Sequence, residues 1–330
     1  MSKISWGVIS TAKIGTEKVI PAMQHGKYTE ITAIASRNIE TAKSTAAKLK
    51  IAKAYGSYEE LLADKAIDAI YIPLPNHLHV EWILKSLQAG KHVLCEKPIT
   101  MNYHDAADLY NDIKKFPDLK VMEAFMYRHH PHIQHTKKMI QQGAIGDIRN
   151  MHSVFSYYNV DPNNIRNMAD IGGGGLLDIG CYCISISRFM FDEEPVRVSG
   201  TIDFDPQFKT DRLAAAVMEF KKGSATFCCS TQMADHKHAL IFGTEGKIEL
   251  NNPFSTQADE KAIIKRTTKD NKLEKTEFEP VDQYTLQGDY FSKAILDNTN
   301  VPTPFKDAVA NMKVIDAVFE SAKKGTFINL

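Results

Sequence analysis

A turn of small and polar residues follows the first apolar segment of the chain. Residues 4–9 are apolar, residues 10–15 form the turn, and Ile14 and Ile20 begin an amphipathic helical spacing. In such a strand–turn–helix unit the backbone can approach a pyrophosphate, and the first turn of the helix offers N–H groups to it. The usual GxGxxG fingerprint keeps only its last glycine, Gly15. We interpret the turn as a dinucleotide site, with an ordinary helix-capping turn as the alternative.

A basic residue follows the second apolar segment. Residues 31–36 are strand-like and lead into Arg37 and Asn38. An acidic residue at this place commonly binds the ribose hydroxyls of NAD, whereas an arginine can pair with the 2′-phosphate of NADP. A solvated surface charge is the alternative interpretation of Arg37. The sequence predicts NADP(H) in preference to NAD(H).

Strands and helices of about ten residues alternate through the first part of the chain, which predicts a doubly wound parallel sheet of the Rossmann type. The expected strands are residues 4–9, 31–36, 69–74, 92–95 and 120–124. Because the carboxyl ends of parallel strands meet at one edge, the loops after them should converge on one cleft. The candidate nucleotide-binding residues in these loops are Ser10, Thr11, Ala12, Ile14, Gly15, Ser36, Arg37, Asn38, Pro73, Leu74, Asn76, His79, Glu96 and Lys97.

The second part of the chain is richer in strands. Apolar segments at 149–158, 196–204, 213–220, 225–230, 239–242 and 248–250 are separated by short turn signals. This pattern predicts a large, mainly antiparallel open sheet in an α/β domain, with helices on one face. Residues 259–279 are expected to form an exposed hairpin, and residues 289–296 and 307–323 two closing helices. The predicted domains are 1–124, which binds dinucleotide, and 125–330, which binds substrate.

Composition excludes several classes of protein. The 40 basic and 40 acidic residues cancel, and 43% of the 330 residues are hydrophobic. We therefore expect a globular protein that binds neither nucleic acid nor a membrane. The five cysteines have no CxxC spacing, so they are expected to be reduced thiols, and no signal-peptide pattern precedes the first strand. The expected location is the cytoplasm, and the expected partner a small molecule.

Five motifs together resemble one known family. They lie at residues 7–15, 75–79, 96–98, 123–128 and 172–182, and they occur in family order. The chain resembles the glucose-fructose oxidoreductase, inositol dehydrogenase and rhizopine catabolism family, Gfo/Idh/MocA. The resemblance implies a Rossmann domain followed by an α/β domain whose open sheet often mediates assembly. A homodimer or larger homo-oligomer through the C-terminal sheet is expected on this ground.

The same resemblance implies the catalytic residues. The family's EKP lysine corresponds to Lys97, and its Asp-x-Gly-x-His/Tyr motif corresponds to Asp178, Gly180 and Tyr182. These residues should meet across the cleft. With tyrosine at position 182, the chain looks like the branch that contains glucose-fructose oxidoreductase, dimeric dihydrodiol dehydrogenase and NADP-dependent sugar dehydrogenases. The implied activity is an NAD(P)-dependent oxidoreductase acting on CH–OH groups of a sugar, a sugar derivative or a trans-dihydrodiol.

Hydride transfer from a secondary alcohol requires that the hydroxyl also lose a proton. A nearby ammonium lowers the pKa of a tyrosine, so Tyr182 is the favoured proton carrier, with Lys97 as its electrostatic partner or as the alternative acid and base. Asp178 precedes Tyr182 by four residues, so both would project from one helix face and Asp178 could orient the substrate. The glycine run 172–175 is interpreted as a substrate-side loop. The candidate substrate-binding residues are Tyr127, Arg128, Tyr158, Asp178 and Tyr182.

Two other functions are compatible with parts of the sequence. Histidines between His129 and His135 could belong to a metal-dependent enzyme, but no carboxylate completes a recognised ligand pattern, and no metal site is predicted. A non-catalytic NADP-binding regulator is the second alternative, because a Rossmann fold alone does not establish catalysis. Turnover of a sugar or diol would distinguish an enzyme from a regulator.

Overall fold

The computed structural model describes residues 2–330, which divide into two compact units. One unit runs to Met126 and includes Asp282–Val309, and the other comprises Tyr127–Val281 and Ala310–Leu330. The chain first passes from one unit to the other after Met126, close to the domain boundary expected at residue 124. The sequence-based division assigned residues 282–309 to the second domain, whereas the structure places them in the first unit.

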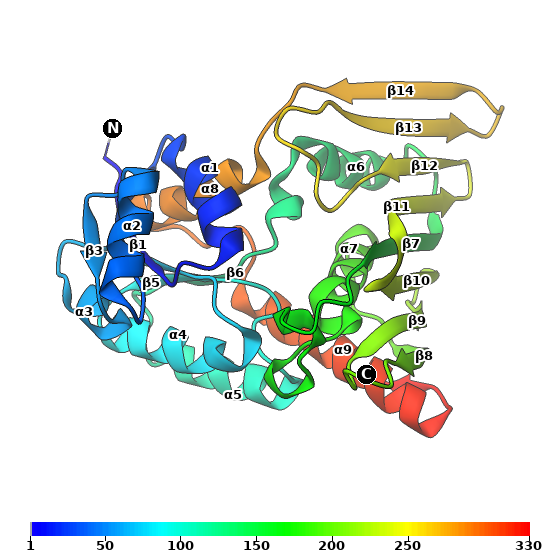
Figure 1. Ribbon diagram of the computed structural model, residues 1–330. Coiled ribbons are helices and arrows are strands. Elements are labelled where there is room, and N and C mark those ends of the chain that lie inside the picture. The colour runs from blue at the N-terminus through cyan, green and yellow to red at the C-terminus, as the bar shows by residue number, and fades with distance from the viewer. Residues whose placement is uncertain (1) are drawn as a thin grey trace. The chain divides into compact units, whose positions relative to one another are not determined.

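Six parallel strands form the sheet of the first unit, in the order β3-β2-β1-β4-β5-β6. The two outer strands, β3 and β6, are labelled in Figure 1. They are β1 (Ile4–Ile9), β2 (Thr29–Ala35), β3 (Lys53–Tyr55), β4 (Ala69–Ile72), β5 (His92–Cys95) and β6 (Val121–Glu123). The predicted parallel sheet is confirmed, and β3 is an additional three-residue edge strand. Strand order reverses between β1 and β4, and ligands of such sheets bind beyond the carboxyl ends at this switch point.

Short polar side chains cap the start of several helices of the first unit. They are α1 (Ile20–Gln24) after a π-helical turn at Gly15–Val19, α2 (Ile39–Leu49), α3 (Tyr58–Ala63), α4 (His79–Gln88), α5 (Tyr103–Ile113) and α8 (Gln283–Leu296). Asn38, Ser57 and Asn102 each accept an N–H from the first turn of α2, α3 and α5. These bonds satisfy N–H groups that the start of a helix leaves without a partner, so α2, α3 and α5 each have a defined beginning.

Helix α8 belongs to the first unit because it packs on β1. The indole N–H of Trp6 donates to Ser292 Oγ at 3.0 Å, and the Trp6 and Phe291 ring centroids lie 5.6 Å apart. Asp289 accepts the N–H groups of Lys27 and Tyr28, just before β2, at 2.9 and 2.8 Å. Both rings are fully buried, so this hydrophobic contact explains why residues 282–309 pack in the first unit.

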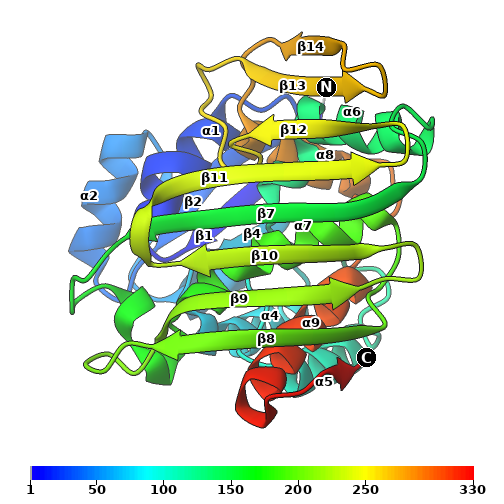
Figure 2. The same ribbon diagram turned by 90° about the vertical axis from the view of Figure 1, so that its right-hand side faces the viewer.

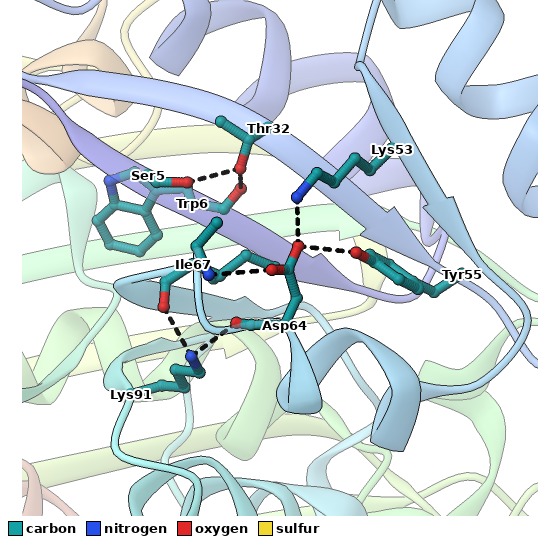
Figure 3. A network of polar contacts seen from close by, with 9 residues as sticks. Ser5, Trp6, Thr32, Lys53, Tyr55, Asp64, Ile67 and Lys91 are labelled. Atoms are coloured by element: carbon teal, nitrogen blue, oxygen red, sulfur yellow. Dashed lines mark hydrogen bonds and ion pairs between the residues drawn. The ribbon is translucent and has the colours of Figure 1, made fainter.

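A network of polar contacts lies at the amino-terminal edge of this sheet (Figure 3). The Asp64 carboxylate accepts from Lys53 Nζ at 2.6 Å and from the Tyr55 hydroxyl at 2.7 Å. The hydrogen bond from Lys53 is the main cause that lowers the pKa of Asp64 far below its usual range. Lys91, just before β5, donates to the carbonyl oxygens of Asp64 and Ile67, both at 2.8 Å. The network fixes the connections that lead into β4 and β5, at the opposite ends of these strands from the nucleotide-binding loops.

Nine strands form the sheet of the second unit, in the order β14-β13-β12-β11-β7-β10-β9-β8-β15. They are β7 (Ile148–Tyr158), β8 (Arg197–Phe204), β9 (Asp211–Glu219), β10 (Ser224–Ser230), β11 (Gln232–Gly243), β12 (Gly246–Asn251), β13 (Ala262–Thr268), β14 (Leu273–Phe278) and β15 (Ile328–Asn329). β7 and β10 are parallel and the other neighbours antiparallel, so the predicted mainly antiparallel sheet is confirmed. The predicted hairpin is β13–β14, which extends the edge of the sheet.

One face of this sheet carries helices and the other is open (Figure 2). The helices are α6 (Pro131–Gln141), α7 (Cys181–Phe191) after a π-helical turn at Leu176–Gly180, and α9 (Phe305–Lys324). Along β9, Ala216 and Met218 are buried, whereas Val217 between them is 38% exposed. This alternation is expected of a sheet with one solvated face. None of the helices formed by residues 2–330 combines the length and apolar character needed to cross a membrane.

Candidate active site

The turn after β1 adopts a backbone conformation usual for glycine, although the sequence has a serine there. Ser10 has φ of 86°, and its hydroxyl accepts the N–H of Ala12 at 3.2 Å and donates to the carbonyl of Pro73 at 3.3 Å. A Cβ at Gly15 would lie 3.3 Å from the Pro73 ring, so glycine lets the helix start pack closely against the loop after β4. The turn thus keeps the geometry of a dinucleotide fingerprint without its first two glycines.

The first helical turn after this loop has N–H groups available to an anion. Its N-cap residue, Ile14, makes no side-chain cap hydrogen bond. Thr11, Ala12 and Ile14 are partly exposed and have short or apolar side chains. Unsatisfied N–H groups at a helix start favour a phosphate. The geometry therefore fits the pyrophosphate of a dinucleotide.

The loop after β2 places Arg37 in solvent. The Ser36 N–H bonds the carbonyl of Tyr55 at 3.1 Å, and the Ser36 hydroxyl accepts the N–H of Asn38 at 3.3 Å. Asn38 also caps α2 through the N–H of Thr41 at 3.0 Å. Ser36 and Asn38 therefore shape the loop, and the exposed guanidinium of Arg37 is its available charge.

His79 joins the loops after β4 and β5 rather than facing solvent. Its ring is fully buried, with Nε2 2.8 Å from the carbonyl oxygen of Leu74 and Nδ1 2.9 Å from that of Pro98. Burial lowers the pKa of His79, so the ring is neutral and donates to one carbonyl at a time. His79, predicted to bind the nucleotide, instead positions the carbonyl groups of Leu74 and Pro98 in these two loops.

The remaining residues of this edge lie on the same two loops. Pro73 is buried, Asn76 is half-buried at the start of the 3-10 turn Asn76–Leu78, and Lys97 is half-buried before Pro98. Glu96 accepts a hydrogen bond at 2.6 Å from the hydroxyl of the buried Tyr71. The carboxyl edge of the sheet thus brings the predicted nucleotide-binding residues to neighbouring loops.

In the second unit, Asp178 is held by two side chains, and we call Asp178, Tyr157 and Arg166 the Asp178 cluster. Asp178 Oδ2 accepts from the Tyr157 hydroxyl at 2.6 Å and from Arg166 Nε at 2.8 Å. The Asp178 side chain is 12% exposed and that of Arg166 42%. The Asp178 charge raises the pKa of Arg166 above its usual range, and burial is the main cause that raises the pKa of Tyr157. Both therefore remain hydrogen-bond donors to Asp178.

Tyr182 lies in an aromatic group at the start of α7. Its ring centroid is 5.6 Å from that of Tyr127, 5.5 Å from Phe155 and 5.8 Å from Phe254. The side chain is 5% exposed, and it interacts electrostatically with Arg166. These rings fix the plane of the phenol, so its hydroxyl has a defined direction.

The structure gives two predicted substrate-binding residues a different role. The Tyr127 hydroxyl lies 2.7 Å from Ser185 Oγ, and Arg128 Nη2 donates to the same oxygen at 2.7 Å. Both side chains are buried, and the Arg128 guanidinium also packs over Phe189. Their polar groups contact Ser185 of α7, the helix that carries Tyr182, and thereby hold this helix in place.

Tyr158 and Tyr157 point to opposite faces of the sheet. Tyr158 is 68% exposed at the end of β7, whereas its neighbour contacts Asp178. The sequence-based prediction included Tyr158 among the substrate-binding residues and did not include Tyr157. Strand alternation is the signal that favours Tyr157, because it shares a face with Phe155, which packs on Tyr182. Arg166 was not predicted, and only its place shortly before the glycine run could have suggested it.

Two histidines at the start of α6, His130 and His132, form a buried pair. His130 Nδ1 lies 2.5 Å from His132 Nδ1, and both rings are fully buried. Burial lowers the pKa of His130 to about 4 and that of His132 to about 3, so both are neutral. In residues 2–330, no three histidine, cysteine or acidic side chains are arranged to hold a metal ion.

The chain matches known proteins along nearly its whole length. The model of the GFO_IDH_MocA oxidoreductase family with NAD-binding Rossmann fold matches residues 4–125, and that of the GFO/IDH/MocA C-terminal domain matches residues 133–249. An uncharacterized oxidoreductase of Rhizobium meliloti is 41% identical over 99% of each chain. D-xylose 1-dehydrogenase (NADP(+)) 2 of Haloferax volcanii is 34% identical over 98% of this chain and 99% of that protein.

A solved structure shows the same arrangement of elements. A 3-ketoreductase from Actinomadura kijaniata, in complex with NADP and TDP-benzene, has a TM-score of 0.89 and 29% identity, covering 97% of this chain and 98% of that one. The family matches include both the nucleotide turn and the segment that carries Asp178 and Tyr182. The chain belongs to the Gfo/Idh/MocA family of oxidoreductases.

Proposed function

We propose that this protein is a dehydrogenase or reductase that prefers NADP(H) and acts on a CH–OH or carbonyl group. The proposed substrate is a sugar, a sugar derivative or a trans-dihydrodiol. The Asp178 cluster carries this proposal, because a carboxylate, a phenol and a half-exposed guanidinium can together hold neighbouring hydroxyl groups. Relatives named as a xylose dehydrogenase and a 3-ketoreductase support the same class of reaction.

The first unit would hold NADP(H) through the loops at the carboxyl edge of its sheet. The turn from Ser10 to Gly15 would receive the pyrophosphate, and Arg37 would pair with the 2′-phosphate. Bound NADP(H) supplies or accepts the hydride at its nicotinamide. NAD(H) is the alternative cofactor, because the turn itself does not contact the 2′-phosphate that distinguishes the two nucleotides.

We propose that Tyr182 and Lys97 serve the proton transfer. Tyr182 would exchange a proton with the substrate oxygen, and the ammonium of Lys97 would stabilise the phenolate or act as the alternative proton carrier. Asp178 would orient the substrate hydroxyl. Tyr127 and Arg128 would act through α7, by positioning Tyr182.

Arg37→Ala is expected to weaken NADPH binding by about 10- to 100-fold, the effect of losing one or two charge-assisted hydrogen bonds. NADH binding should change little, because NADH has no 2′-phosphate. The measurement is a fluorescence titration of purified protein with each nucleotide. Lys48→Ala, which removes another exposed charge at the end of α2, is the matched control and should leave both affinities unchanged.

Two results of this titration would contradict the cofactor proposal. An equal loss of both affinities would show that Arg37 does not contact the 2′-phosphate. No binding of either nucleotide to the unmodified protein would overturn the assignment of the turn. Binding without turnover of D-xylose, D-glucose or a trans-dihydrodiol would favour the alternative, a non-catalytic NADP-binding regulator.

We propose that the open face of the nine-stranded sheet mediates self-association. Apolar side chains on this face include Val154, Val217, Leu240 and Phe242, and the last of these is 38% exposed. β9, β10, β7 and β11 are consecutive in the sheet, so these side chains lie near its centre. A second copy of the chain would bury this face.

Val217→Asp is expected to shift a dimer or larger oligomer to monomer, because it places a charge at the centre of the face. Light scattering coupled to gel filtration measures the mass. Leu273→Asp is the control, since Leu273 is 54% exposed at the start of β14 on the edge hairpin. A monomeric unmodified protein, or an unchanged mass for Val217→Asp, would contradict the proposal.

We further propose that the protein acts in the cytoplasm. All five cysteines are free thiols and four are buried, which fits a reducing compartment. Cell fractionation with an antibody against the chain would test this location. Recovery with a secreted or membrane fraction would contradict it.

A further inference from the structure

A buried carboxyl group lies beneath the glycine run that precedes Asp178. Asp211, the first residue of β9, is 2% exposed, and its Oδ2 accepts the N–H of Leu176 at 2.5 Å. A Cβ at Gly174 would lie 1.9 Å from Asp211 Oδ1, and Gly174 has φ of 120°. The carboxyl group therefore fills the space beside this glycine, and the turn is built around it.

The other side of the same turn is bonded to the Asp178 cluster. The Gly174 N–H donates to the carbonyl of Arg166 at 2.9 Å, and the Gly174 carbonyl accepts the N–H of Asp178 at 3.1 Å. Arg166 returns to Asp178 through its Nε at 2.8 Å. Asp211 thus holds a turn that is also bonded to the backbone of Arg166 and of Asp178.

We propose that Asp211 is a positioning residue, whose carboxylate fixes the turn at residues 174–176 and thereby the orientation of the Asp178 cluster toward substrate. It acts through Leu176 and Gly174 and does not contact substrate itself. The effect of Asp211 on catalysis rests on the proposed function, whereas its effect on the turn at residues 174–176 does not depend on that function.

The groups around Asp211 make its ionisation sensitive to neutral pH. Burial raises the pKa of Asp211 to about 7, the N–H groups of Leu176 and Gly175 oppose the rise, and the Asp178 charge adds to it. Tyr157 from β7 and Cys229 from β10 also interact electrostatically with this carboxyl group. The ionised form accepts the N–H groups of the turn more strongly, so the turn should tighten as pH rises through about 7.

Asp211→Asn tests the inference, because the amide keeps the shape and removes the charge. We expect kcat/KM of the full chain with NADP to fall by about 10- to 100-fold, the scale of a modest misplacement of reacting groups. The rise of kcat/KM between about pH 6 and 8 should disappear, with NADPH affinity unchanged.

Asp205→Asn is the matched control. Asp205 is also buried, and its Oδ1 accepts the N–H groups of Gln207 and Phe208 at 2.7 and 2.8 Å in the turn before β9. Its loss should lower the melting temperature but leave kcat/KM and its pH profile unchanged. A wild-type pH profile and kcat/KM in Asp211→Asn would overturn the catalytic consequence.

A second measurement does not depend on activity or on folding of the variant. In the unmodified protein, the NMR shift of the Leu176 amide proton should titrate between about pH 6 and 8, because its acceptor gains a proton. The Gln207 amide proton, whose acceptor is Asp205, should not titrate in this range. A Leu176 shift that is constant with pH would overturn the pH dependence of the turn, whereas absence of turnover by the unmodified protein would overturn only the proposed function.

Discussion

Tyr182→Phe is expected to lower kcat by about 10²- to 10⁴-fold, the range that positioned proton transfer contributes. The substitution removes only the hydroxyl and keeps the ring that packs against Tyr127, Phe155 and Phe254. The fold and NADPH affinity should therefore be retained. Steady-state kinetics in both directions, with a nucleotide titration and a thermal melt, measure the three quantities.

Tyr110→Phe is the control for loss of a tyrosine hydroxyl. The Tyr110 ring stacks on Phe305 at 6.1 Å in the first unit, and its hydroxyl has no proposed role, so its kcat should be unchanged. Near-normal turnover by Tyr182→Phe would refute Tyr182 as proton carrier. Loss of turnover in Lys97→Met with retention in Tyr182→Phe would assign the proton transfer to Lys97.

Asp178→Ala is expected to lower kcat/KM by about 10²-fold or more, because Arg166 and Tyr157 lose the acceptor that orients them. It should also destabilise the fold by about 1–3 kcal/mol, the cost of leaving polar groups unsatisfied. A fully buried ion pair would cost more, but the Arg166 side chain is 42% exposed and water partly replaces the carboxylate. Kinetics and chemical denaturation measure the two effects.

Asp178→Asn separates the catalytic effect of Asp178 from its structural effect. The amide oxygen retains an acceptor for one of the two donors, so most of the stability should return. The charge that orients the substrate hydroxyl is still absent, so kcat/KM should stay low. Full recovery of kcat/KM by Asp178→Asn would show that the carboxylate charge has no role in the reaction.

Several elements of the fold follow from short stretches of sequence. Strands β1 and β5 have the predicted bounds, and α9 extends one or two residues beyond each end of the helix predicted at 307–323. These segments have a clear apolar period and a turn or capping signal at an end, which are local properties. β3 was not predicted, because three partly exposed residues carry no period. β11 is much longer than predicted, because its polar residues 232–238 are strand only through pairing with β7.

Local patterns in the sequence predict the order of strands and helices, the nucleotide turn, and the segments that carry Lys97, Asp178 and Tyr182. They do so because apolar periodicity, turn residues and motifs each depend on residues that are neighbours in the chain. The packing of α8 on Trp6, the contacts of Arg128 with α7, and the bond from the glycine turn to Asp211 become visible only in the folded protein. Arg166 lies 12 residues from Asp178, and Asp211 lies 35 residues from Leu176. Such bonds form only when folding brings residues far apart in the sequence next to each other. No pattern among neighbouring residues shows which distant residues will meet.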